Sequence, residues 1–154
     1  MFTIHFPEFD FKVKTENGKR LIFDIVRKKY VTITPEEWVR QHILHYLIEV
    51  KQYPQGFISV EHALAVNNMP KRCDVLVFNK LFQPALIIEC KQPDIALAQN
   101  IFDQAGRYNL TLQVPYLAIT NGTHNMAAQL HLKTGTILFL KDYPEYEALN
   151  NSAG

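Results

Sequence analysis

Two acidic residues and a lysine lie in short apolar segments near the middle of the chain. Asp74 opens the apolar run 74–78, and Glu89 and Lys91 close the run that begins at residue 85. Charged groups inside apolar strands are costly unless they are paired or bind a cation. Carboxylate oxygens are the ligands that Mg²⁺ prefers. The pattern therefore predicts a divalent-cation site with a lysine beside it.

The two runs predict an antiparallel hairpin, 74–78 with 85–90. A turn centred in 79–84 places Asp74 directly opposite Glu89, where the Cβ atoms are roughly 4.5–5.5 Å apart. Two carboxylates at that separation can share one cation. Lys91 follows Glu89 by two residues and so points to the same face of the hairpin.

Periodicity predicts the elements around this hairpin. Alternation from Phe9 to Val13, a turn at Glu16-Asn17-Gly18 and a second apolar run to Ile25 predict an N-terminal β-hairpin. Thr34 is the expected N-cap of a helix that runs to about Gln52. The remaining expected elements are a strand at 58–66, a helix at 94–108, a strand at 115–120, a helix at 125–131 and a strand at 136–140.

This order predicts one α/β domain (α+β type), a mixed sheet flanked by helices. A chain of 154 residues with 47% hydrophobic content buries one ordinary core. We expect a hairpin extension over 1–33, a core over 34–142 and a tail over 143–154.

Composition narrows the class of protein. No apolar stretch approaches the length of a membrane span, no secretory signal pattern opens the sequence, and no G-x-x-x-x-G-K-[ST] loop is present. A cytoplasmic protein with no membrane contact and no ATPase site of its own is expected. The net charge of +1 neither requires nor excludes a polyanionic partner. Basic residues nevertheless cluster early, at Lys12, Lys14, Lys19, Arg20, Arg27, Lys28 and Lys29.

The spacing Asp74, then Glu89-Cys90-Lys91, resembles the signature of PD-(D/E)XK nucleases, with Cys73 where the Pro usually stands. Further segments are similar to the N-terminal nuclease domain of type I restriction enzyme R subunits. They are Thr34-Pro-Glu-Glu-Trp-Val-Arg-Gln41, Val60-Glu-His62, Lys71-Arg-Cys-Asp74, Phe102-Asp-Gln-Ala-Gly-Arg-Tyr-Asn109 and Thr120-Asn-Gly122. The acid-acid-lysine triad is a weak signal, whereas the ordered set of segments is specific.

The resemblance implies a restriction-endonuclease-like fold and Mg²⁺-dependent hydrolysis of DNA, with Mn²⁺ as a substitute. In the family, the acids that match Asp74 and Glu89 bind the metal, together with the carbonyl that matches Cys90. The lysine that matches Lys91 positions or activates the attacking water. Such a site is chemically sound, because a metal stabilises charge on the phosphate and a neighbouring cation adds to that effect.

The resemblance adds three helical residues to the site. Gln104 and Tyr108 match a Q-x-x-x-Y feature that supports the catalytic centre or contacts DNA, and Glu37 matches an acid of the first helix. Each has a structural alternative. Glu37 is equally explained as the capping-box acid after Thr34, and Gln104 and Tyr108 as the polar edge of a packed helix.

Other residues near the site have alternatives too. Lys91 could neutralise Glu89 as an ion pair, although the apolar surroundings favour catalysis. His42 and His45 are three residues apart on a helix but lack an evident third zinc ligand. One of Glu61 and His62 is expected to face the site.

The register that pairs Asp74 with Glu89 also sets Cys73 opposite Cys90. We expect these to be two reduced, packed thiols, because a cytoplasmic chain is kept in reducing conditions.

Two functions follow. The first is a metal-dependent endonuclease that acts alone or with separately encoded restriction or motor subunits. The alternative is a catalytically silent module that keeps the nuclease fold for nucleic-acid binding or complex assembly. One active site cuts one strand at a time, so double-strand cleavage requires a homodimer or two visits.

Overall fold

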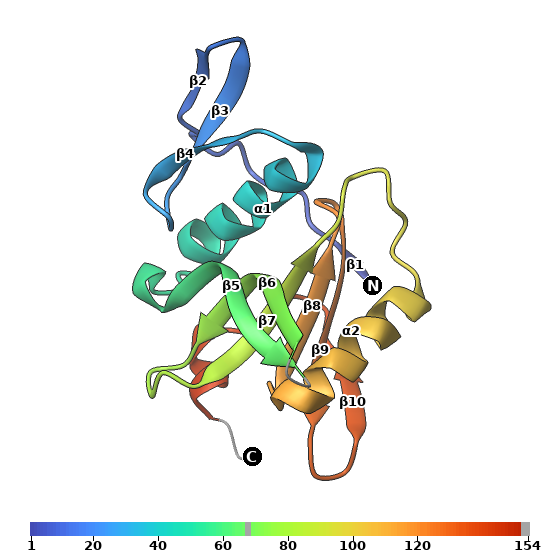
Figure 1. Cartoon of the computed structure of the whole chain (residues 1–154). Helices are drawn as coiled ribbons and strands as arrows, with labels where there is room; N and C mark the ends of the chain where they lie inside the picture. Colours follow the sequence, from blue (N-terminus) through green and yellow to red (C-terminus); the bar gives the residue numbers. More distant parts are fainter. Residues whose placement is uncertain (67–68, 152–154) are drawn as a thin grey trace.

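The computed structural model describes the backbone of residues 1–66 and 69–151. Side chains within these ranges are described except at 64, 66, 69–71, 104–105 and 107–111. A mixed seven-stranded sheet forms the body of the domain, and a separate three-stranded sheet stands beside it (Figure 1). The expected α/β fold with a mixed sheet and flanking helices is confirmed.

The N-terminal sheet is an antiparallel meander of β2 (Val13–Glu16), β3 (Lys19–Asp24) and β4 (Lys29–Thr32). Positive φ angles at Asn17 (53°) and Gly18 (75°) give the tight two-residue turn that joins β2 to β3. The predicted hairpin is thus present, although its first strand begins at Val13 rather than Phe9. The third strand, β4, was not predicted, because three consecutive basic residues hide its alternation.

The large sheet has the strand order β1-β9-β8-β7-β6-β5, and β10 also pairs with β9. Strands β7 and β8 are parallel and the other neighbours are antiparallel. The strands are β1 (Phe2–Thr3), β5 (Ile58–Val66), β6 (Met69–Phe78), β7 (Pro84–Cys90), β8 (Tyr116–Thr120), β9 (His124–His131) and β10 (Thr136–Phe139).

Two helices cover the two faces of this sheet (Figure 1). Helix α1 (Pro35–His45) continues into a π-helical turn, η1 (Tyr46–Val50), and α2 spans Gln99–Leu112. Short 3₁₀ turns lie at η2 (Gln55–Phe57) and η3 (Tyr146–Asn150). No helix in the described part of the chain is long and apolar enough to cross a bilayer.

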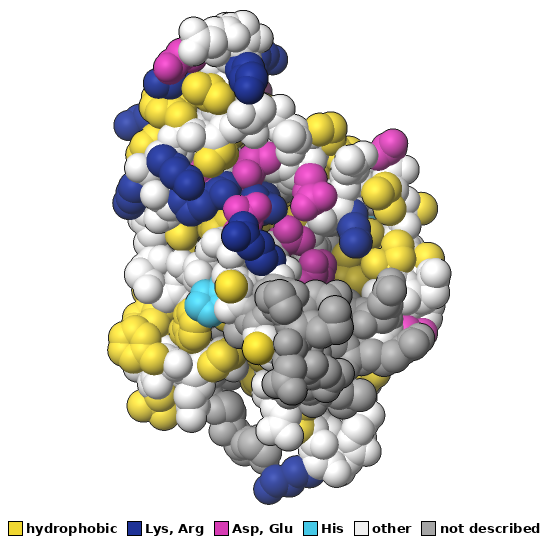
Figure 2. All heavy atoms as spheres, in the orientation of Figure 1, with side chains coloured by type: hydrophobic (Ala, Val, Ile, Leu, Met, Phe, Trp, Pro, Cys, Tyr) yellow, Lys and Arg dark blue, Asp and Glu magenta, His cyan; other side chains and the backbone are white. Residues whose placement is uncertain are grey.

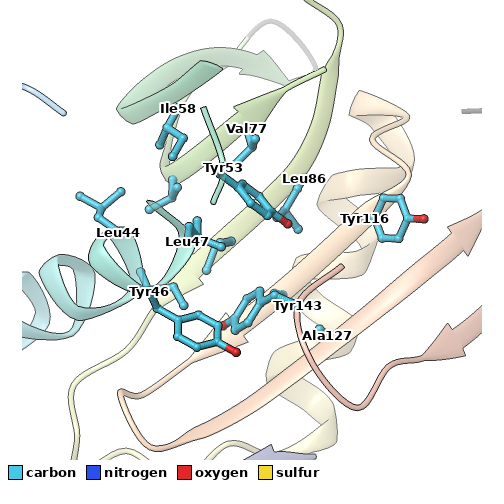
Figure 3. Packing of buried hydrophobic residues seen from close by; sticks show 14 of the residues in the cluster. Leu44, Tyr46, Leu47, Tyr53, Ile58, Val77, Leu86, Tyr116, Ala127 and Tyr143 are labelled. Carbon is cyan, nitrogen blue, oxygen red and sulfur yellow. The ribbon is translucent and has the colours of Figure 1, made fainter. Parts of the chain in front are cut away.

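Each face of the sheet has its own apolar core. On the α1 side, Leu44 and Leu47 pack against Val77 and Leu86, and Tyr143 closes the cluster (Figure 3). Full burial of each such aliphatic side chain contributes roughly 1.5–3 kcal/mol. The second core, on the α2 side, is formed by Cys73, Leu76, Ile87, Leu97, Phe102, Val114, Leu117, Ile119, Met126, Ala128 and Leu130. These cores fix the strands that end at the candidate site.

The predicted helix at 125–131 is wrong, because this segment forms β9. Its residues pair with β8 on one side and with β1 and β10 on the other. The run Met-Ala-Ala-Gln-Leu favours a helix locally, but pairing with strands on both sides outweighs that preference. Helix α2 also begins five residues later and ends four residues later than expected, at Gln99 and Leu112.

Candidate active site

The hairpin of β6 and β7 has the predicted register. Val75 lies opposite Ile88 and Val77 opposite Leu86. Continued by one residue, this register brings Asp74 beside Glu89. The backbone pairing of the two strands ends at Val75 and Ile88. Beyond it the Asp74 side chain accepts the next hydrogen bond, from the backbone N–H of Cys90 to Oδ2 at 2.8 Å.

The surroundings of Glu89 disfavour its ionised form. Burial, followed by the charge of Asp74 and a side-chain hydrogen bond with it, raises the pKa of Glu89 to about 8. Two neighbouring carboxylates repel each other when both are ionised. A cation beside the pair would therefore be favoured.

Lys91 stands at the end of the same strand, and its backbone N–H donates to the carbonyl of Thr120 in β8. The Lys91 charge favours the ionised forms of Glu89 and Glu36. Within the described residues, however, no carboxylate oxygen lies within the 4 Å that defines an ion pair with its ammonium. The Lys91 ammonium is therefore near the acids but forms no ion pair with a described carboxylate.

Glu36, in the first turn of α1, is a third acid of the site that the sequence did not identify. Burial, then the charge of Asp74, raises the pKa of Glu36, and a side-chain hydrogen bond with Asp74 adds to the shift. Its side chain remains 44% exposed, so it forms the rim of the site. Glu36 precedes Arg40 by one helical turn, and the two side chains lie 3.7 Å apart.

Glu37, the acid that the resemblance singles out, points away from the pair. The Thr34 hydroxyl accepts the Glu37 backbone N–H at 3.0 Å, which is one half of the capping box. The Glu37 carboxylate does not complete the box. It accepts hydrogen bonds from Arg27 Nη2 at 2.7 Å, Arg40 Nη1 at 2.9 Å and Gln41 Nε2 at 3.2 Å. Its link to the site runs through Arg40.

Arg40 joins α1 to the acid pair. Its guanidinium is buried and donates from Nη1 to Glu37 at 2.9 Å and from Nη2 to Asp74 Oδ1 at 3.0 Å. Burial would lower the pKa of Arg40, but Glu37 and Asp74 outweigh it and raise the value. The Nε atom has no partner. Arg40, like Glu36, is a residue of the site that the sequence analysis did not identify.

The ion pairs continue from Arg40 to the N-terminal sheet. Arg27, in the turn between β3 and β4, binds Glu37 and also Asp24 at 2.7 Å. Glu61 closes the group from β5, 3.3 Å from Arg27 and 3.6 Å from Arg40. Of the two β5 residues considered, Glu61 thus faces this network, whereas His62 bonds Ser59 and packs on Phe78.

Several sequence candidates lie elsewhere. Cys73 and Cys90 are free and buried, but they belong to cores on opposite faces of the sheet and are not packed on one another. His42 and His45 lie in an aromatic cluster with Phe9 and Phe11.

Two further candidates cannot be placed in detail. The backbone positions of Gln104 and Tyr108 belong to α2, and their side chains lie outside the described residues.

The donor set suits a hard divalent cation, although it is not arranged as a ready cage. Among the described residues no three His, Cys, Asp or Glu side chains are grouped as ligands. Arg40 and the Cys90 N–H each donate to one oxygen of Asp74. Asp74 and Glu89 nevertheless supply adjacent carboxylates that need a cation when both are ionised.

Comparison with known proteins finds a family for most of the chain. Residues 35–144 match the family described as type I restriction enzyme R protein N terminus. Curated protein sequences give no significant match. Among solved structures, a chain described as an HsdR subunit of a type I restriction enzyme from Vibrio vulnificus YJ016 is similar, at 19% identity and a TM-score of 0.47. The match covers 72% of this chain but 24% of that one.

Proposed function

The chain belongs to the family of type I restriction enzyme R protein N termini, and from that premise we propose that it is a Mg²⁺-dependent nuclease domain that hydrolyses DNA phosphodiester bonds. The observation that carries the proposal is the placement of Asp74 beside Glu89 and Cys90 at the end of the β6–β7 hairpin, with Lys91 next along the chain. A buried pair of carboxyl groups lowers the stability of the fold. Its presence beside a lysine therefore favours a functional role for these residues.

Asp74 and Glu89 would hold the metal, with the Cys90 carbonyl as a further ligand and Glu36 at the rim. A bound Mg²⁺ would supply stabilisation of the charge that develops on the phosphate during hydrolysis. Mn²⁺ has the same preference for carboxylate and water ligands and should substitute.

The protein side chains have separate tasks in this scheme. Glu89 would have to be ionised to hold a cation, so protons would compete with the metal at this residue, whose pKa is raised. Arg40, in α1, orients Asp74 through its hydrogen bond to Oδ1. Lys91 contributes a positive charge beside the scissile phosphate and orients the attacking water.

Plasmid nicking tests the proposal. Wild type should nick supercoiled DNA in Mg²⁺ or Mn²⁺ and not in EDTA. Lys91→Met should lower the rate by about 10²-fold or more, because one preorganised charge contributes that much. Lys80→Met, an exposed lysine in the β6–β7 turn, is the matched control and should keep full activity. Equal rates for wild type and both variants would exclude catalysis at this site.

A catalytically silent assembly or binding module remains the second candidate, and one observation favours it. Both oxygens of Asp74 are satisfied without a metal, by Arg40 and by the Cys90 N–H. This candidate requires that Mn²⁺ leave the protein's melting temperature unchanged. The function would then be interaction with other restriction subunits. A pull-down with those subunits measures it.

A further inference from the structure

The N-terminal sheet lies before the residues that match the family, and one of its faces is free. On the inner face, Ile22 is fully buried and Asp24 accepts a hydrogen bond from Gln41 of α1 at 2.9 Å. Side chains alternate along a strand. Leu21 and Phe23 of β3 therefore point outward, together with their cross-strand partners Lys14 and Tyr30.

The outer face combines lysines with aromatic rings. Lys14 Nζ lies 4.1 Å from the ring centre of Tyr30, and Lys12 Nζ lies 5.6 Å from that of Phe23. The two rings meet edge to face with 5.3 Å between their centres. Tyr30 is 38% exposed, so its ring can be reached from solvent. Glu16 is the acid on this face, 2.9 Å from Lys14.

The sheet is much more basic than the rest of the chain. Residues 12–32 contain seven Lys or Arg and two Asp or Glu, a net +5, while the whole chain is +1. The remainder is thus −4. Of the seven cations only Arg27 is largely covered; the exposed ones are Lys12, Lys14, Lys19, Arg20, Lys28 and Lys29. Figure 2 shows Lys and Arg gathered over this sheet, with Asp and Glu beneath it on the same side.

The sheet is also held in a fixed position relative to the acid pair. Asp24, Arg27, Glu37, Arg40 and Asp74 form a continuous row of charge pairs in which each contact is 3.0 Å or shorter. The row crosses from the β3–β4 turn through α1 to β6. A polyanion bound on the outer face would therefore be held at a defined distance from Asp74.

We propose that the outer face of the β2–β3–β4 sheet is a nucleic-acid binding surface, on which Lys12, Lys14 and Lys19 contact phosphates while Tyr30 and Phe23 contact sugar or base. Cations interleaved with aromatic rings match the alternating phosphates and bases of a strand. The inference concerns binding alone and does not depend on the proposed hydrolysis.

Fluorescence anisotropy in EDTA tests it, because cleavage cannot occur there. The probes are a labelled 20-nucleotide single strand and the corresponding duplex. The sheet variant carries Lys12→Gln, Lys14→Gln and Lys19→Gln. The control variant carries Lys80→Gln, Lys133→Gln and Lys141→Gln. These three lysines are exposed and lie outside the N-terminal sheet, so the control loses the same charge as the sheet variant. All six side chains are exposed, so both variants should melt like wild type.

The sheet variant should bind at least about 10-fold more weakly than wild type, and the control within about 2-fold. On duplex DNA its salt slope should fall by up to about 0.9 for each lysine that contacts a phosphate. Tyr30→Ala should weaken single-strand binding further at constant salt slope, since stacking releases no counterions.

Three results would overturn the assignment. One is equal loss in the sheet and control variants, which would reflect net charge alone. Another is displacement of the probe by poly-glutamate at equal charge concentration, which would show a general polyanion surface. The third is no binding by wild type at 50 mM salt. Asp74→Asn should bind like wild type, so loss of nicking with retained binding would separate the two proposals.

Discussion

Arg40 of α1 donates a hydrogen bond to Asp74 of β6 at 3.0 Å, across 34 residues of sequence. The same guanidinium holds Glu37 at 2.9 Å. Asp74 is thereby oriented from two sides, by Arg40 of the helix and by the backbone N–H of Cys90 in its own hairpin. The candidate metal ligand and the first helix form one unit, so a substitution in the helix changes the site without touching a ligand.

Arg40→Gln should lower the free energy of unfolding by about 3 kcal/mol, because it leaves the Asp74 and Glu37 carboxylates without their shared cation. Urea denaturation measures this. Arg72→Gln is the matched control: its guanidinium is 72% exposed and 3.8 Å from Glu61, and its loss should cost less than about 0.5 kcal/mol. Equal stabilities for the two variants would contradict the role of Arg40.

Substitutions of Glu36 and Glu37 should have different effects, the first on activity and the second on stability. Glu36→Gln removes an exposed acid at the rim of the site and should reduce nicking by about 10–100-fold, as loss of groups around a metal commonly does. Its stability should stay within about 0.5 kcal/mol of wild type. Glu37→Gln weakens the contacts to Arg27 and Arg40 and should cost about 2 kcal/mol.

Nicking assays and thermal melts on both variants measure the two effects. If Glu37→Gln lost activity without losing stability, Glu37 would act at the site directly, as the family resemblance suggests.

The hairpin was predictable from sequence, whereas the choice between Glu36 and Glu37 was not. Two apolar runs joined by a short turn allow few registers, and a slip by one residue would move every side chain to the other face of the sheet. Successive helical residues point about 100° apart. Which of two adjacent acids faces the sheet therefore depends on how α1 is rotated against it, and no local pattern records that rotation.

Strand β9 shows the same limit. The burial of Asn125, Met126, Ala127 and Ala128 in succession comes from packing on both faces of the sheet. A strand covered on both sides loses the alternation that would reveal it in the sequence.

The raised pKa of Glu89 should make stability fall as pH rises. The pKa of Glu89 is about 8 in the folded protein against 4.5 for the free side chain. Below pH 4.5 the carboxyl is protonated in both states and the difference vanishes. Between 4.5 and 8 only the folded state holds the proton, so raising the pH destabilises it, by roughly 4–5 kcal/mol over the whole interval.

Thermal melts of wild type and Glu89→Gln from pH 5 to 9 measure this contribution. The glutamine cannot titrate, so the wild-type curve should decline relative to the variant across the window. Parallel curves would mean that Glu89 is already ionised in the folded protein and that the acid pair carries no proton.

Mn²⁺ should raise the melting temperature, and more strongly at pH 8.5 than at pH 6, because the proton of Glu89 competes with the cation. At a concentration one hundred times Kd, binding stabilises the folded state by about 2.7 kcal/mol. For a domain of this size that corresponds to a rise of roughly 5–10 °C. Asp74→Asn should abolish the shift, whereas Glu61→Gln should retain it, since Glu61 faces Arg27 and Arg40 instead of the pair. A wild-type melting temperature that Mn²⁺ leaves unchanged at both pH values would rule out a cation at these carboxylates.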